Sequence, residues 1–275
     1  MTVSSLQFIT SKVQQLRPIF EAGRVSDRFI ATPAAAGPWS KDSCHGGAPS
    51  ALMVYAAEQV PTLVPMDVAR VTVELLRPVP VAELSVATVI AREGKKLQLV
   101  EIDLRSGDTQ VARATVLKLR RNAVELPAEA APPKFDMLPP EAGKPTSSRV
   151  RDGFVDAHSI SAIKGGFLEP GPAAVWFRLN SALVSGQATS GAMRAMAAAD
   201  SGNGISGVLP FAEWSFINAD LTVSLFREPQ GEWILVDAET LFGPEGRALS
   251  RSRLADRHGW FGQASQSLLV EQRSL

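Results

Sequence analysis

The sequence predicts an α+β fold of two tandem units, each an antiparallel sheet wrapped around a central apolar helix. Residues 69–78, ARVTVELLRP, return at residues 219–228 as ADLTVSLFRE, with Ala, Thr, Val, Leu and Arg at matching positions. Two unrelated strands can share β-branched residues and Leu by chance. Here each copy is also preceded by a turn entering an apolar helix-like run and followed by further strand-like runs. A repeat of this kind indicates a duplicated architecture.

Composition narrows the class of protein. With 275 residues and 45% apolar content, the chain can build two ordinary cores. The formal net charge is zero and no long basic block occurs, which argues against nucleic acid as a partner. The first twenty residues lack a signal-peptide pattern, and no run of 18 apolar residues occurs. We therefore expect a soluble cytoplasmic protein with no membrane insertion.

Metal and disulfide chemistry are not expected. Cys44 is the single cysteine, which excludes an intramolecular disulfide and a thiolate cluster. The three histidines, His45, His158 and His258, lie far apart in sequence. We predict neither a metal site nor a cofactor.

A proline-rich segment divides the chain. Six prolines lie between Pro127 and Pro145, a density that blocks both helices and strand ladders. We predict an N-terminal unit at 1–123, an extended surface linker at 124–150 and a C-terminal unit at 151–275. Each sheet would have an exposed edge, so we expect the two units to associate.

Within each unit a helix is followed by strands. The first helix is predicted at 49–59, where Pro49 suits the first helical position and the run has no polar face, so that it must be covered on all sides. The second is predicted at 190–199. Alternation and turn signals predict strands at 69–76, 83–93, 97–106, 111–120, 214–227, 233–240, 248–256 and 261–272.

Three segments resemble the acyl-CoA thioesterase II family and its thioesterase-like relatives, which have a double hotdog fold. They are GPWSKDSCHGGAPSALM at 37–53, WSFINADLTVSLFREPQGEWILVDAET at 214–240 and DRHGWFGQASQSLLV at 256–270. The resemblance implies that an Asp after the second-half helix, a Thr or Ser on the next long strand and a Gln on the last strand hold the hydrolytic water. Asp200 and Gln266 match the first and last. Asn218 occupies the hydroxyl position, and alternation predicts Thr222 on the same sheet face.

The residues themselves leave two interpretations for each acidic or amide group. Asp200 ends an apolar helix, where the macrodipole disfavours an anion and would raise its pKa toward that of a general base. Alternatively, it caps the following turn. Gln266 has the parity of core-facing Leu268 and needs a polar partner, which could be a water or a backbone group. For Asp220 we favour a structural role.

The turn before the first helix is the predicted substrate-binding element. Gly46 and Gly47 would let backbone N–H groups at a helix N-terminus approach a thioester oxygen. The alternative is a tight turn that needs positive φ. His45 binds substrate or only caps and packs, and Trp39 is a candidate for acyl or pantetheine contact.

Two tempting motifs are set aside. Cys44 and His45 are adjacent in sequence, and adjacent side chains rarely meet, so a cysteine nucleophile is not expected. The segment GNGISG at 202–207 has the spelling of a dinucleotide fingerprint but follows a helix and not a strand, so we interpret it as a loop.

The sequence thus predicts an acyl-CoA thioesterase in which the acyl chain lies in a tunnel between the units, and a water held by Asp200 and Gln266 attacks the thioester. We expect a homo-oligomer, either a dimer or a tetramer. The alternative is a non-catalytic acyl-binding or scaffolding protein with a degenerate site, suggested by Asn218. A hydratase is a further rival, disfavoured because neither His158 nor His258 is expected near Asp200.

Overall fold

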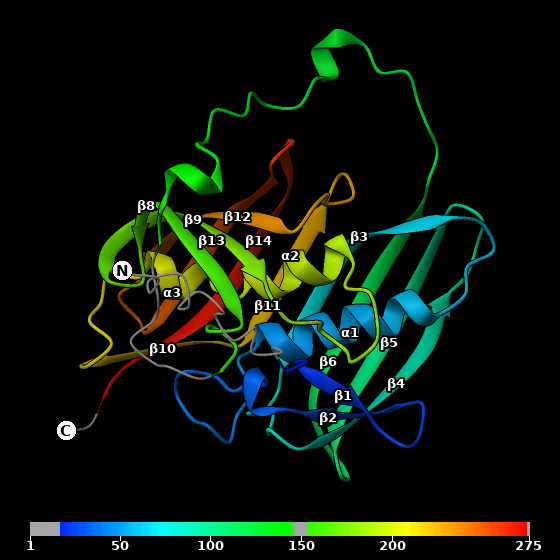
Figure 1. Cartoon of the computed structure of the whole chain (residues 1–275), viewed down its shortest axis with the longest axis horizontal. Coiled ribbons are helices and arrows are strands. Elements are labelled where there is room, and N and C mark those ends of the chain that lie inside the picture. Colours follow the sequence, from blue (N-terminus) through cyan, green and yellow to red (C-terminus); the bar gives the residue numbers. More distant parts are fainter. Residues whose placement is uncertain (1–16, 146–152, 274–275) are drawn as a thin grey trace, which may run out of the picture.

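A computed structural model of the protein describes residues 17–145 and 153–273, and within them the strands form a single antiparallel sheet of 14 strands (Figure 1). The N-terminal half contributes β1 (Phe20–Ala22), β2 (Arg28–Ala31), β3 (Met66–Leu75), β4 (Glu83–Arg92), β5 (Leu97–Ser106) and β6 (Thr109–Arg120). The C-terminal half contributes β7 (Lys144–Pro145), β8 (His158–Gly166), β9 (Glu169–Leu179), β10 (Trp214–Asn218), β11 (Asp220–Leu225), β12 (Trp233–Phe242), β13 (Arg247–Asp256) and β14 (Gly259–Gln272).

The predicted strands are present, with two kinds of difference. The run predicted at 214–227 is divided into β10 and β11. Five strands were not predicted: β1, β2, β7, β8 and β9. The sequences of β8 and β9 contain the glycines and prolines of a loop, but the two prolines of β9 lie in its first residues, where proline is tolerated.

The two halves join along one pair of strands, as the expected edge association requires. β3 pairs antiparallel with β11, and Thr72 lies opposite Thr222. These two residues are 150 positions apart, which is also the displacement of the sequence repeat. A pseudo-two-fold axis therefore passes between them, and their hydroxyl oxygens lie 3.3 Å apart.

Three helices fill the space enclosed by the sheet: α1 (Gly47–Gln59), α2 (Gly191–Ala199) and α3 (Gly202–Ser206). Every residue of α1 from Gly47 to Val54 is buried, as its lack of a polar face predicts. The helix α2 begins at its N-cap Ser190, whose hydroxyl accepts a hydrogen bond from the backbone of Met193. The first turn of α1 contacts the end of α2, and Glu58 near the end of α1 accepts from Ser190, so the two helices lie antiparallel.

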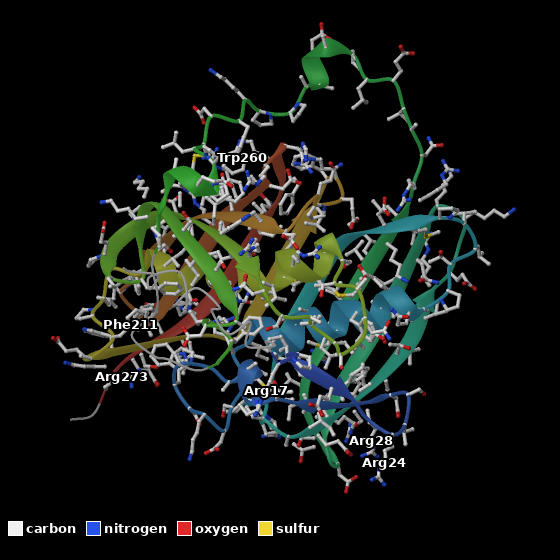
Figure 2. All side chains as sticks on the ribbon, in the orientation of Figure 1. Arg17, Arg24, Arg28, Phe211, Trp260 and Arg273 are labelled. Carbon is white, nitrogen blue, oxygen red and sulfur yellow. The ribbon has the colours of Figure 1, made fainter. Side chains whose placement is uncertain are left out.

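The proline-rich segment is extended in its first part but packs on the C-terminal half in its second part. Lys134 and Leu138 accept hydrogen bonds from the indole N–H groups of Trp260 and Trp176 through their carbonyl oxygens, at 3.3 and 2.9 Å. Phe135 contacts the Trp260 ring edge to face. The segment thus covers apolar side chains on the outer face of the sheet, beside the position of Trp260 in Figure 2.

Candidate active site

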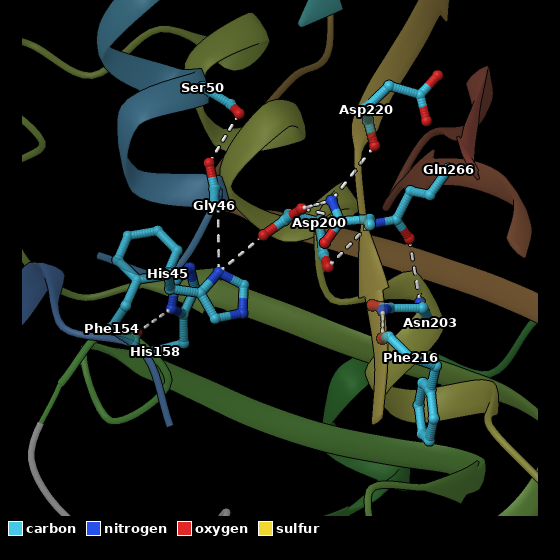
Figure 3. A network of polar contacts seen from close by, with 12 residues as sticks. His45, Gly46, Ser50, Phe154, His158, Asp200, Asn203, Phe216, Asp220 and Gln266 are labelled. Carbon is cyan, nitrogen blue, oxygen red and sulfur yellow. Dashed lines mark hydrogen bonds and ion pairs between the residues drawn. The ribbon is translucent and has the colours of Figure 1, made fainter. Parts of the chain in front are cut away.

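A buried carboxylate lies where the beginning of α1 meets the end of α2. Asp200 directly follows α2 and is 4% exposed. Its Oδ2 atom lies 2.9 Å from Nδ1 of His45, which comes from the turn before α1 (Figure 3). The two residues are thus supplied by opposite halves of the chain, and the site requires the association of both.

Two amide side chains from the C-terminal half hold the other carboxylate oxygen. Asn218, at the end of β10, donates from Nδ2 to Asp200 Oδ1 at 2.8 Å. Gln266, on β14 and 2% exposed, donates from Nε2 to the same oxygen and to the Asp200 carbonyl, each at 3.2 Å. The Oε1 atom of Gln266 accepts from the backbone N–H of Asn203 at 3.1 Å. Asp200, Asn218 and Gln266 are therefore brought together as the resemblance implied.

The pKa of Asp200 is shifted in the direction opposite to the prediction. Burial alone would raise it, but the charge and hydrogen bond of His45 and the hydrogen bond from Asn218 outweigh burial and lower the pKa. The predicted rise considered only the C-terminal end of α2. In the structure the carboxylate also faces the N-terminal end of α1, including the Gly47 N–H, where a negative charge is favoured.

The two glycines are explained by close approach to this carboxylate. A Cβ atom on Gly46 would lie 2.8 Å from Asp200 Oδ2, and one on Gly47 would lie 2.7 Å from the carbonyl oxygen of Ala197. Neither is among the glycines with positive φ. The alternative of a positive-φ turn is therefore wrong. Because the Gly47 N–H faces Asp200 and His45, it is already engaged within the protein and not free for a thioester oxygen.

Thr222 lies on the opposite face of the sheet, so the expectation that it shares a face with Asn218 is wrong. Asn218 pairs with Leu268, whereas Thr222 pairs with Ser265. From Asn218 to Thr222 the chain advances by four residues, whereas the paired strand β14 advances by only three, from Leu268 to Ser265. This one-residue shift, at the break between β10 and β11, reverses the alternation of side chains between the two faces. Thr222 consequently lines an outer-face cavity of about 740 Å³ together with Ser265.

Trp39 and Asp220 also have defined positions. Trp39 is 57% exposed, and its ring lies 5.4 Å from that of Phe211 and 5.4 Å from the Arg273 guanidinium. Phe211 and Arg273 lie close together in the view of Figure 2. Among the described residues, no contact joins Trp39 to the Asp200 carboxylate. Asp220 accepts from the backbone N–H of Ser267, which is the structural role favoured for it.

The segment at 202–207 was interpreted wrongly as a loop, because its first five residues form the helix α3. Gly202 is needed there, since a Cβ atom would lie 2.8 Å from Ser252 Oγ and 3.1 Å from Gln266 Oε1. Asn203, which sequence reasoning did not select, donates its backbone N–H to Gln266 and its side-chain N–H to the carbonyl of Phe216. The glycine content that suggested a loop instead permits a tight contact between α3 and β14.

The remaining thiol and imidazole groups have different surroundings. Burial raises the pKa of the Cys44 thiol to about 12, and Sγ faces the Pro80 carbonyl, so no thiolate forms near neutral pH. Burial lowers the pKa of His158 to about 4, and its Nδ1 lies 2.8 Å from the Phe154 carbonyl oxygen, to which the neutral ring donates. Within the described residues, no cluster of three or more His, Cys, Asp or Glu could hold a metal ion.

One ground for disfavouring a hydratase does not hold. That argument considered only His158 and His258 as partners for Asp200, yet His45 makes the contact at 2.9 Å. His45 and Asp200 are 155 residues apart, and the local sequence around each residue does not predict their contact. Their meeting follows from the antiparallel packing of α1 against α2.

Both halves of the chain match models of one protein family. Residues 35–119 match the acyl-CoA thioesterase N-terminal domain and residues 126–270 match the acyl-CoA thioesterase C-terminal domain. The chain therefore belongs to the acyl-CoA thioesterase family and is a thioester hydrolase by class. The sequence has no significant match among curated proteins.

Solved structures support the double hotdog fold. A hot dog fold protein from Alicyclobacillus acidocaldarius has a TM-score of 0.72 and 16% identity over 90% of this chain and 94% of that one. The tesB protein of Mycobacterium avium subs paratuberculosis has a TM-score of 0.62 and 16% identity, covering 89% and 92%. The acyl-CoA thioesterase II TesB2 of Mycobacterium marinum has a TM-score of 0.61 and 14% identity, covering 91% and 94%. The predicted fold class is confirmed.

No helix in the described parts of the chain combines the length and apolar character that a membrane span requires. The oligomeric state, the cytoplasmic location and the tunnel between the units stay predictions. Asp200 lines neither the cavity at Thr222 nor a second one, which lies between Glu58 and Lys118.

Proposed function

We propose that this protein hydrolyses an acyl-CoA thioester to the free acid and CoA by direct attack of a water activated beside the network of Asp200, Asn218, Gln266 and His45. The observation that carries the proposal is a buried, ionised carboxylate at the junction of the two halves, held by two amide donors and one imidazole. No covalent intermediate is needed. The acyl group would lie against apolar surface between the halves.

Burying a charge is costly unless it is paired and hydrogen-bonded. Four donors surround the Asp200 carboxylate and offset this cost. An apolar side chain at this position would need no such donors, and the preceding helix is almost entirely apolar. A structural cap for the turn after α2 would not require His45 from the other half of the chain. The arrangement therefore favours a chemical role over the turn-capping alternative.

The decisive experiment compares the parent protein with Asp200→Asn, which keeps the shape of the side chain and removes the charge. Release of free CoA thiol from a series of acyl-CoA substrates is followed with a thiol reagent. We expect kcat/KM to fall by about 10² to 10⁴, the usual range for loss of general acid–base catalysis. Ser224→Ala, on the outer face of the sheet, is the matched control and should retain the parent rate.

Two results would contradict the proposal. Parent protein that binds acyl-CoA without releasing thiol would support the non-catalytic acyl-binding alternative. Full turnover by Asp200→Asn would show that this network does not contribute to catalysis.

The contact between His45 and Asp200 also supports a second candidate, hydration of a 2-enoyl-CoA, because that chemistry commonly uses an Asp and a His together. Incubation with a 2-enoyl-CoA separates the two functions. A hydratase would remove the conjugated enoyl absorbance and leave the thioester intact, whereas a thioesterase would release thiol from saturated and unsaturated substrates alike. Family membership favours hydrolysis.

A further inference from the structure

The carboxylate of Asp200 has no free hydrogen-bonding position. An ionised carboxylate offers about four acceptor positions. Oδ1 accepts from Asn218 and Gln266 at 2.8 and 3.2 Å, and Oδ2 contacts His45 at 2.9 Å. The fourth donor is the backbone N–H of Gly47. A water could contact this carboxylate only by displacing one of its protein partners, and the lowered pKa makes the carboxylate a weak base.

The amide of Gln266 is used in the same way. Its Nε2 donates to the side chain and the main chain of Asp200, and its Oε1 accepts from the Asn203 N–H. A water held jointly by Asp200 and Gln266 therefore has no position in this arrangement of the side chains. The group that accepts the proton must be found elsewhere in the network.

The second nitrogen of His45 meets that requirement. Nδ1 lies 2.9 Å from Asp200 Oδ2 and 3.2 Å from the Gly47 nitrogen, and it cannot donate to one and accept from the other at once. The shorter contact and the Gly47 N–H facing the carboxylate favour a proton on Nδ1. Nε2 is then an acceptor in the neutral ring. No described residue contacts it by a hydrogen bond, the side chain is 13% exposed, and Figure 3 draws Nε2 turned away from Asp200.

The ring orientation of His45 is fixed from two sides. The Asp200 carboxylate holds one edge, and the ring of Phe154 stacks on its face with centroids 5.2 Å apart and planes 29° from parallel. A held imidazole with one nitrogen bound to a carboxylate and the other free is the arrangement by which a carboxylate orients a general base.

We propose that His45 is the catalytic base, and that Asp200 is the positioning residue that orients it and stabilises its protonated form. This inference rests on the proposed hydrolysis and assigns its proton transfers. His45 Nε2 takes a proton from water as the water oxygen bonds to the thioester carbonyl carbon, and the C=O electron pair moves to oxygen. When the C–S bond breaks, the carbonyl re-forms and His45 returns the proton to the departing CoA sulfur. The products are the acid and the thiol, with His45 unchanged.

Three titratable groups surround His45. Asp200 faces Nδ1 from the end of α2, and His158 lies behind Phe154 on β8. Cys44 precedes His45 in the chain, but its thiol is turned to the Pro80 carbonyl. Since burial lowers the pKa of His158 to about 4 and raises that of Cys44 to about 12, neither changes its charge between pH 5 and 8. Loss of activity on acidification within that range therefore comes from neither His158 nor Cys44.

The test compares the parent with His45→Gln and His45→Ala in acyl-CoA hydrolysis from pH 5 to 8. We expect kcat/KM to fall by about 10²-fold or more in both variants. Any fall in rate that the parent shows toward low pH should be absent from the residual activity of His45→Gln. Added imidazole should restore part of the rate to His45→Ala, which leaves space for the missing ring, but not to His45→Gln. Thermal unfolding of each variant checks that the fold is retained.

A measurement on the parent protein covers the case in which neither variant folds. Diethylpyrocarbonate modifies unprotonated imidazoles, and peptide mass spectrometry distinguishes the three histidines. Activity should decline in proportion to modification of His45. Full activity after complete modification, or His45 variants that keep the parent rate and pH profile, would overturn this assignment while leaving the Asp200-dependent hydrolysis intact. A parent protein without thioesterase activity would overturn both.

Discussion

The helix pair has two ends, and a carboxylate lies at each of them. At one end Asp200, after α2, meets the beginning of α1, and at the other Glu58, near the end of α1, accepts a hydrogen bond from Ser190 at the beginning of α2. The pKa values move in opposite directions. Burial raises that of Glu58 to about 7, whereas the donors around Asp200 outweigh burial and lower its pKa. Similar backbone positions thus give a carboxyl group that stays partly protonated near neutral pH at one end and a stable anion at the other.

The difference comes from the strands. Val100 pairs with Val116 in the first half, and Ser250 pairs with Gln266 in the second, so Gln266 corresponds to Val116 at the repeat displacement of 150. By the same displacement Asn218 corresponds to Val68, next to which β3 has its own shift of register. The second half supplies amides where the first supplies valines. We infer that the donors on the sheet, and not the carboxylate alone, define the functional end.

Among the amide donors on the sheet, the largest effect is expected when Gln266 is replaced by its first-half counterpart, Val116. Gln266→Val leaves the Asn203 N–H and one side of Asp200 without a partner. We expect kcat/KM to fall by about 10²-fold, and the free energy of unfolding to fall by about 1–3 kcal/mol, the usual cost of an unsatisfied buried group. Acyl-CoA hydrolysis and urea unfolding measure the two effects.

Combination with Asp200→Asn sharpens this result. Because the two side chains act as one unit, the double variant should lose little more activity than Asp200→Asn alone. Multiplied losses would mean that Gln266 acts independently of Asp200, for example by binding the substrate directly.

The duplicated fold that underlies this comparison could largely be predicted from the sequence. The repeat predicted two similar units, and their exposed sheet edges predicted that the units associate. The repeat displacement of 150 residues corresponds to the pairing of Thr72 with Thr222 in the central strands. The uninterrupted apolar run of α1 predicted a helix buried on all sides, and the strand at 97–106 was placed correctly to the residue. These features depend on local periodicity, which a sequence records directly.

The site could be predicted only in part, for three physical reasons. A register shift next to Ala219 reverses which side chains face the core, and no residue type there marks it, so Thr222 was assigned to the wrong face. The contact of His45 with Asp200 joins residues from opposite halves, and its distance depends on how α1 packs against α2. Asn203 was overlooked because it acts through its backbone.

A moderate effect is expected at Asn218, where two substitutions separate shape from hydrogen bonding. Asn218→Val, the first-half counterpart, removes the 2.8 Å donor to Asp200, and we expect a loss of about tenfold to a hundredfold in kcat/KM. Asn218→Thr keeps a donor and should lose less than about tenfold. Rates with the same acyl-CoA, measured together with unfolding midpoints, test both expectations.

Asn218→Thr also tests the degenerate-site alternative. A large gain in hydrolysis with Thr would mean that the parent site is impaired by Asn218. We expect no such gain, because the amide N–H already holds the carboxylate that a hydroxyl would otherwise contact.

The smallest effect on activity is expected at the other end of the helix pair. Glu58 borders a cavity of about 380 Å³ that also contacts Lys118 and Glu228, and Glu58→Gln keeps an acceptor for Ser190. We expect kcat/KM to stay within about twofold of the parent. Stability should change instead. The raised pKa means that the parent gains stability from protonated Glu58 below about pH 4.5 and loses it as pH rises through about 7.

Glu58→Gln cannot ionise, so its stability relative to the parent should increase from pH 5 to pH 8, by on the order of 1–2 kcal/mol for a partly buried group. Urea unfolding of both proteins at the two pH values isolates this term, because every other titratable group is shared. Equal pH dependence in both proteins would contradict a raised pKa of Glu58. A large loss of hydrolysis in Glu58→Gln would contradict the proposed difference between the two ends of the helix pair. It would mean that Glu58, and not only Asp200, contributes to catalysis.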